Sequence, residues 1–251
     1  MFGFDPATFA VITGALVVGG VVKGITGIGL PIVAMAILLN FVDPKVTLAI
    51  VVLPILVTNL WQGFRLGNVM EPLKRFWLMT AFFLVFLFLG SRLVVVLDAN
   101  ALFGVLGVCV AVFAASNLIR PRVHPLGPRT EKWAGPVAGA LGGVLGGLTT
   151  IWGPPMMMYL VMLKLDKDTW IRTVGLIWFA GSIPLTIAYW HNGILNAGTA
   201  PLSAYACVPG MIGIRIGEVI RDRIDQESFR KVMLIALVVI GLNLIRRAVF
   251  A

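Results

Sequence analysis

Two short breaks decide how this chain folds: residues 24–31 read GITGIGLP, and residues 147–155 read GLTTIWGPP. Each break combines glycines, which allow unusual backbone angles, with proline, which can begin a helix but cannot continue one. A long apolar run precedes each break, and a short apolar run follows it. The two breaks therefore predict two helical hairpins, each with its bend at a glycine-rich or proline-rich segment.

The rest of the sequence is strongly apolar. Apolar residue types make up 59% of the 251 residues and charged types only 12%, and the mean hydropathy is +0.98. Soluble domains carry about 25% charged residues. Backbone polar groups find no partner in lipid, so long apolar runs without a strand alternation must be helices. The expected fold is all-α, a polytopic helical membrane protein.

Two of the apolar segments are too short to cross a membrane. Residues 28–40 would reach about 20 Å and residues 153–163 about 16 Å, against a hydrocarbon core of about 30 Å. Both follow one of the breaks, so each is expected to be the returning arm of a re-entrant or broken hairpin. The ten apolar segments are 7–22, 28–40, 47–61, 76–97, 101–119, 134–150, 153–163, 170–190, 199–216 and 229–246.

The two halves of the chain resemble each other. Four motifs recur at spacings of 123 to 126 residues: Gly24 with Gly147, Pro31 with Pro155, residues 90–93 (GSRL) with 213–216 (GIRI), and residues 117–120 with 243–246 (NLIR in both). Such a constant spacing predicts a duplication. We expect a first transmembrane repeat over 1–122, a connecting loop over 123–133 and a second repeat over 134–251.

The basic residues alternate along the chain. Of the 20 lysines and arginines, 15 lie in the loops after the third, fifth, seventh and ninth segments. Basic loops face the cytoplasm, which would place both termini outside, although Arg246 and Arg247 break this pattern. Matching loops of the two halves carry opposite charge bias. This contrast favours inverted over parallel repeats.

Composition and spacing also exclude several kinds of function. The net charge of +9 lies in short loop clusters rather than along one soluble face, so no nucleic acid partner is expected. Cys109 and Cys207 lie inside apolar runs without a CxxC motif, and we expect no metal and no cofactor. His124 and His191 fall on opposite sides of the expected topology, so the chain is not expected to be an enzyme.

With these motifs in view, the chain resembles the sulfite exporter TauE/SafE family of membrane proteins over most of its length. The paired breaks, the Gly-x-Arg pairs Gly90/Arg92 and Gly213/Arg215, and the two halves carry the resemblance. It implies transport of sulfite, sulfonates, thiosulfate or related organosulfur anions across a bacterial inner membrane. Which anion is carried and in which direction stay open.

The hairpin tips are the candidate substrate site. Hairpins that enter from opposite faces bring their tips together near the midplane, where repeat transporters bind substrate. The first N–H groups of each short arm, with the positive end of the helix dipole, suit an oxyanion. The expected substrate-binding residues are Lys23, Thr26, Gly27, Gly29 and Pro31 at the first tip, and Thr149, Thr150, Trp152, Gly153 and Pro154 at the second.

Further candidates come with alternatives that the sequence leaves open. Lys23 either serves the anion or extends to a membrane interface, because a charge at membrane depth costs a few kcal/mol. Asn59 and Ser182, which are 123 residues apart, either face the site or bond a neighbouring helix. Glycines at every fourth position from Gly135 to Gly147 predict close helix packing, and such faces permit a homodimer without requiring one.

Energy coupling is the last feature that the sequence addresses. No Asp or Glu falls in the middle of an apolar run, so a carboxylate proton relay lacks a carrier. An anion uniporter driven by the membrane potential needs none, since one charge moving through 100 mV gains about 2.3 kcal/mol. We therefore expect an exporter or facilitator. A passive anion-selective channel is the alternative.

Overall fold

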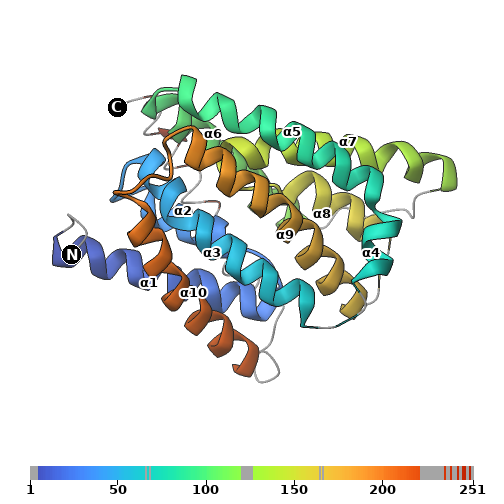
Figure 1. Ribbon diagram of the computed structural model, residues 1–251, viewed down its shortest axis with the longest axis horizontal. Coiled ribbons are helices and arrows are strands. Elements are labelled where there is room, and N and C mark those ends of the chain that lie inside the picture. Colours follow the sequence, from blue (N-terminus) through green and yellow to red (C-terminus); the bar gives the residue numbers. More distant parts are fainter. Residues whose placement is uncertain are drawn as a thin grey trace. The chain divides into compact units, whose positions relative to one another are not determined.

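The computed structural model describes residues 5–65, 67, 69–119, 127–163, 165 and 167–220, with six single positions at 235, 238, 242, 245, 246 and 249. Every regular element in these residues is a helix, which confirms the expected all-α fold (Figure 1). The helices are α1 (Pro6–Thr26), α2 (Leu30–Leu38), α3 (Pro44–Phe64), α4 (Met70–Arg75), α5 (Trp77–Val96), α6 (Ala99–Ile119), α7 (Pro128–Thr149), α8 (Gly153–Met162), α9 (Lys167–His191) and α10 (Ala200–Ile220).

Nine of the ten expected segments correspond to helices. The tenth, residues 229–246, lies outside the described residues apart from single positions. Helix α4 was not expected, because its six residues include a proline and three charged side chains. Helix α7 begins at Pro128, before the expected start at 134, because its first turns are polar and a hydropathy scan passes over them.

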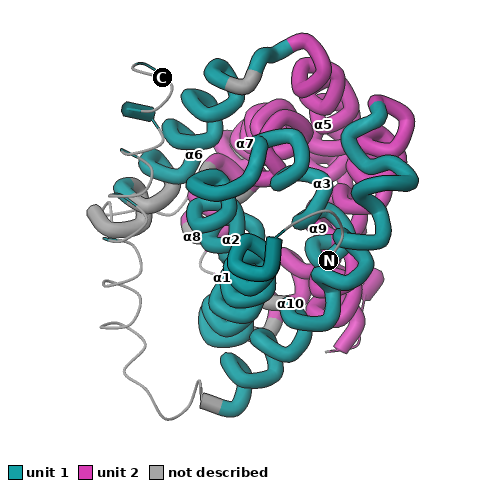
Figure 2. Tube along the Cα trace, turned by 90° about the vertical axis from the view of Figure 1, so that its left-hand side faces the viewer, with its two compact units in different colours: residues 1–55, 97–119, 193–251 teal, residues 56–96, 120–192 magenta. Residues whose placement is uncertain are grey.

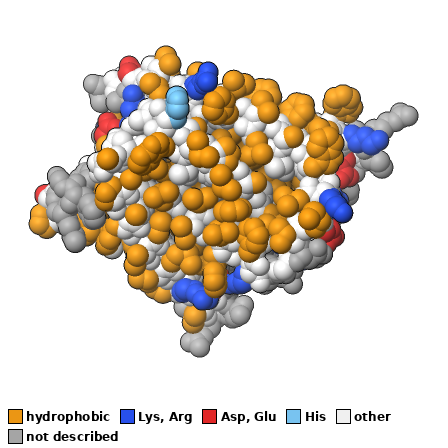
Figure 3. Space-filling model, viewed as in Figure 1, with side chains coloured by type: hydrophobic (Ala, Val, Ile, Leu, Met, Phe, Trp, Pro, Cys, Tyr) orange, Lys and Arg blue, Asp and Glu red, His pale blue; other side chains and the backbone are white. Residues whose placement is uncertain are grey.

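Four described helices have the length and composition to cross a membrane: Pro6–Thr26, Pro44–Phe64, Trp77–Val96 and Arg172–His191. Hydrophobic side chains cover much of the face shown in Figure 3, and Lys and Arg lie near its edges. Exposed tryptophans lie close to helix ends at Trp77, Trp133 and Trp190. Such residues anchor helices at membrane interfaces. The chain is a multi-pass membrane protein.

The chain divides into two compact units (Figure 2). Unit 1 holds Met1–Ile55, Leu97–Ile119 and Gly193–Ala251, and unit 2 holds Leu56–Val96 and Arg120–Asn192. Each unit takes helices from both halves of the sequence. Unit 1 contains α1, α2, α6 and α10, and unit 2 contains α4, α5, α7, α8 and α9, while α3 contributes to both.

The order of helices repeats along the chain. Helix α7 begins 122 residues after α1, and α8, α9 and α10 each begin 123 residues after α2, α3 and α5. The lengths also match closely, with 21 and 22 residues in α1 and α7 and 9 and 10 residues in α2 and α8. The spacing of sequence motifs is therefore also the spacing of helices.

In unit 1, helix α1 packs closely against α10. A side chain added at Gly20 would meet backbone atoms of Gly210 and Gly213, and one added at Gly24 would meet those of Ile214 and Gly217. The contact moves forward on both helices together, so α1 and α10 run parallel. Backbones in direct contact are the packing that glycine faces provide in membrane helices.

In unit 2, helices α5 and α7 pack in the same way. Side chains added at Gly139, Gly143 and Gly147 would meet backbone atoms of α5, which confirms the packing role expected for these glycines. Gly135 instead faces Tyr159 of α8, whose hydroxyl would lie 3.2 Å from an added Cβ. The glycine faces that permitted a homodimer are thus occupied within the chain.

Candidate functional site

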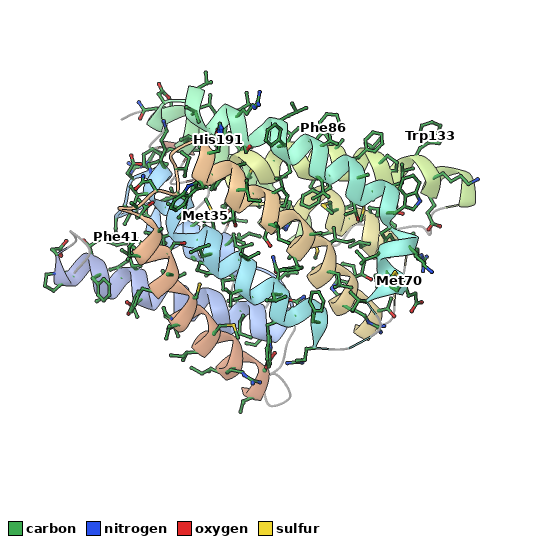
Figure 4. The ribbon with its side chains drawn as sticks, in the orientation of Figure 1. Met35, Phe41, Met70, Phe86, Trp133 and His191 are labelled. Atoms are coloured by element: carbon green, nitrogen blue, oxygen red, sulfur yellow. The ribbon has the colours of Figure 1, made fainter. Side chains whose placement is uncertain are left out.

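Helices α1 and α2 form the first predicted hairpin, called hairpin 1. An added Cβ on Gly19 would lie 2.8 Å from the carbonyl oxygen of Leu30, and one on Gly29 would lie 3.1 Å from Val22. The chain therefore returns antiparallel along α1. Met35 of the short arm is fully buried, whereas Phe41 just beyond it is 60% exposed (Figure 4).

The tip of hairpin 1, residues 26–29, owes its bend to two glycines. Gly27 caps α1 with a φ of 81°, and its N–H donates to the carbonyl of Lys23 at 2.7 Å. Gly29 precedes α2 with a φ of 107°. Both angles are costly for any residue with a Cβ, which explains the glycines. Pro31 lies in the first turn of α2, as expected.

The hydroxyl of Thr26 closes this bend. It lies 2.8 Å from the carbonyl oxygen of Val22 and 2.7 Å from that of Ile28, and it accepts the Ile28 N–H at 3.3 Å. A hydroxyl has one proton, so it donates to one of these carbonyls at a time. An anion at this tip would have to take that proton from a backbone carbonyl.

Helices α7 and α8 form hairpin 2, whose tip at residues 149–152 repeats two of these bonds. The Thr149 hydroxyl donates to the carbonyl of Leu145 at 2.6 Å and accepts the Ile151 N–H at 3.1 Å. Thr150 caps α7 with a φ of 60°, the only positive φ outside glycine among the described residues. A β-branched residue is strained there. Both breaks thus form helical hairpins, as predicted, and their re-entry into the membrane stays a prediction.

Lys23 lies inside unit 1 with 4% of its surface exposed. Gly19 of α1 faces α2 and Gly20 faces α10. At 100° per residue, Lys23 falls between these two directions, so its side chain enters the groove between α1, α2 and α10. Its burial counts against the alternative that it extends to a membrane interface.

The position equivalent to Lys23 in hairpin 2 is Gly146, and an aromatic ring covers it. An added Cβ on Gly146 would lie 2.8 Å from the ring of Trp152. The Trp152 ring meets Phe83 of α5 edge-on at 5.5 Å between centroids, and it lies 6.2 Å from the ring of Trp178 on α9. All three aromatic side chains are at most 6% exposed.

Asn59 and Ser182 both belong to unit 2 and are 1% and 0% exposed. Asn59 lies one turn before Gly63, where α3 packs against Gly175 of α9. The Ser182 hydroxyl donates to the carbonyl of Phe179 at 2.8 Å. Both residues lie where helices pack together, and their role as substrate ligands stays a prediction.

Trp178 is the residue of this region that the sequence did not single out. Its Nε1 is buried and has no hydrogen-bond partner in the described part of the chain. Its counterpart 123 residues earlier is Ile55, so a comparison of the two halves gave no signal. In sequence, a tryptophan in an apolar run cannot be distinguished from a core residue, because its hydrogen-bond partners are not visible there.

The family model of the sulfite exporter TauE/SafE family matches residues 11–244. The chain belongs to this family. The resemblance seen in the sequence is thereby confirmed, and so is the expectation that the chain is not an enzyme, because the family is one of transporters. The chain is a membrane transporter of sulfur-containing anions. Searches of curated proteins and of solved structures gave no match.

Proposed function

We propose that this transporter moves small sulfur oxyanions such as sulfite, sulfonates or thiosulfate out of the cytoplasm, across a bacterial inner membrane. The family match and the apolar helices support the substrate class and the membrane. An interior-negative potential drives an anion outward without a coupling ion, at about 2.3 kcal/mol per charge and 100 mV. Export as a potential-driven uniporter is therefore the simplest mechanism.

The buried Lys23 is the observation that carries the proposal. It lies one turn before the Gly27 bend and is 4% exposed. When protonated, its amine would attract an anion far more strongly in this low-dielectric interior than in water. Gly27 and Gly29 have no side chains, so an oxyanion can approach the first N–H groups of α2 beside this charge.

Hairpin 2 supplies the second set of proposed contacts. Gly153 and Pro154 begin α8, whose first N–H groups lack intrahelical acceptors. Thr150 and Trp152 lie immediately before them. That both tips serve one substrate, near the midplane, is a proposal from the sequence repeat alone.

The repeats are proposed to be inverted. A hairpin returns its chain to the side from which it came, so α1 with α2 and α7 with α8 add no net crossing. With that rule the loops that follow α3, α6, α8 and α10 all fall on one side, and these are the basic loops. A single cytoplasmic side for all four supports opposite orientations of the two halves.

The test is anion flux in proteoliposomes. Sulfite, thiosulfate, sulfoacetate and chloride are supplied to wild type, Lys23→Met and the control Lys45→Met, which changes a half-buried lysine at the start of α3. We expect saturable flux of one sulfur oxyanion that falls at least about 10-fold in Lys23→Met only. Equal flux in Lys23→Met would refute the site. Flux that does not saturate would favour the channel.

A further inference from the structure

The Nε1–H of Trp178 is a donor without an acceptor. The side chain is 6% exposed, and no described residue accepts a hydrogen bond from this nitrogen. Buried indole N–H groups normally have a partner, and leaving one unpaired costs free energy comparable to a lost hydrogen bond. In a transporter, such a donor can find its acceptor on a bound ligand.

Helix α9 turns the face that carries Trp178 toward hairpin 2. Gly181, on the next turn, lies against the Phe83 ring of α5. Tyr189, three turns further along the same face, donates its hydroxyl to the carbonyl of Gly147 in α7 at 3.0 Å. These two contacts place the face of α9 that carries Trp178 against α5 and α7.

Trp178 also lies beside Trp152, the residue that precedes α8. Its ring lies 6.2 Å from that of Trp152, and Trp152 directly precedes Gly153, the first residue of α8. Helix α8 has 10 residues and carries prolines at its second and third positions, so its free N–H groups are few. An indole donor next to Trp152 would supplement them.

We propose that Trp178 contacts the substrate, and that its Nε1–H donates to an oxygen of the bound sulfur oxyanion. The rings of Trp152 and Phe83 form the apolar wall beside that bond, which keeps water away and strengthens it. This inference rests on the proposed function and names a donor on α9, outside both hairpins. Trp178 thus completes the donor set of hairpin 2 from a neighbouring helix.

The experiment is a calorimetric titration of the detergent-purified protein with sulfite and with thiosulfate. Trp178→Phe removes the donor and keeps an aromatic ring. Trp190→Phe is the control, because Trp190 lies on the same helix and is 56% exposed. A further variant carries benzothienylalanine at position 178, which keeps the shape of tryptophan and replaces its N–H by sulfur.

We expect both donor-free variants to raise the Kd about 10- to 100-fold, the loss expected for one hydrogen bond to a charged acceptor, and Trp190→Phe to bind like wild type. The benzothienylalanine variant should unfold at the wild-type temperature without anion. Wild-type affinity in that variant would overturn the role of Trp178 and leave the proposed function intact. Absence of binding to wild type itself would overturn the proposed function, and this inference with it.

Discussion

Hairpin 1 and hairpin 2 share a bend and differ in what fills the space beside it. Both bends use a threonine hydroxyl between a carbonyl four residues back and an N–H two residues ahead. Beside the bend, hairpin 1 has Lys23 and Gly29, and hairpin 2 has Gly146 and Trp152 at the equivalent positions. A large side chain on one arm is thus matched by glycine on the other.

The helix that packs beside each hairpin differs between the two units as well. Phe83 of α5 packs on Trp152 in unit 2, whereas the equivalent residue of α10 in unit 1 is Ala206. In hairpin 2 the Trp152 ring fills the space beside Gly146, whereas in hairpin 1 Gly29 faces Val22. The backbone of the repeat is kept while one tip carries a lysine and the other a tryptophan.

The largest loss of stability is expected at the glycines that bring two helix backbones into contact in each unit. Leucine at Gly147 would collide with backbone atoms of Leu87 and Ser91 on α5, and Gly147→Leu should abolish folding or cost about 3 kcal/mol or more. Thermal unfolding in detergent measures this. Gly14→Leu is the control, since nothing lies within 4 Å of an added Cβ at Gly14. Equal stability of the two variants would contradict the packing.

The exchange of large and small residues can be measured by a double-mutant cycle in hairpin 2. Trp152→Ala should cost about 3–5 kcal/mol through the cavity it leaves. Gly146→Ala should cost about 1–3 kcal/mol, because the new methyl meets the Trp152 ring. The double variant should lose less free energy of unfolding than the two single variants lose together, by about 1 kcal/mol or more. Additive effects would show that Gly146 and Trp152 do not share this space.

The bend of hairpin 1 depends on the left-handed angle at Gly29. Gly29→Ala should destabilise the protein by about 1–2 kcal/mol, since its φ of 107° is strained for alanine. Gly14→Ala, in the middle of α1, should be neutral or slightly stabilising because alanine favours helix. The difference in unfolding temperature between the two variants is the measurement. A stable Gly29→Ala protein would mean that another residue sets the bend.

The smallest effect concerns the ends of the hairpins away from the tips. Asp5 accepts the N–H groups of Ala7 and Thr8 at the start of α1, whereas Gly127 offers α7 no side-chain cap. Hydrogen bonding from Thr8 holds the pKa of Asp5 below its usual value. The stabilisation is therefore present at neutral pH and is lost as the pH falls through this lowered pKa. The difference between wild type and Asp5→Ala should vanish in acid, and a constant difference would exclude the cap.

Local residue chemistry made the hairpins predictable. The glycines and prolines of residues 24–31 and 147–155 specify bends by their own backbone limits, and their spacing of 123 gives the repeat of helices. The glycines at 139, 143 and 147 predicted close packing of their helix against another, because small residues at every fourth position form one helix face. These features depend on neighbours in the chain.

Features that depend on distant partners were not predictable. The sequence did not show that α1 pairs with α10 and α5 with α7, since those contacts join opposite halves. It offered Thr26 and Thr149 as anion donors, and the structure shows that both hydroxyls already bond backbone groups of their own tips. Trp178 was missed because only the absence of an acceptor distinguishes it from a core tryptophan.

The most direct test of this account is the stoichiometry of sulfite or thiosulfate binding, measured by calorimetry on wild type, Lys23→Met and Trp178→Phe. If the two tips serve one substrate, wild type should bind a single anion per chain, and each substitution should weaken that same event. Two independent binding events, each lost in only one of the variants, would contradict it and would show that the two hairpins are separate sites.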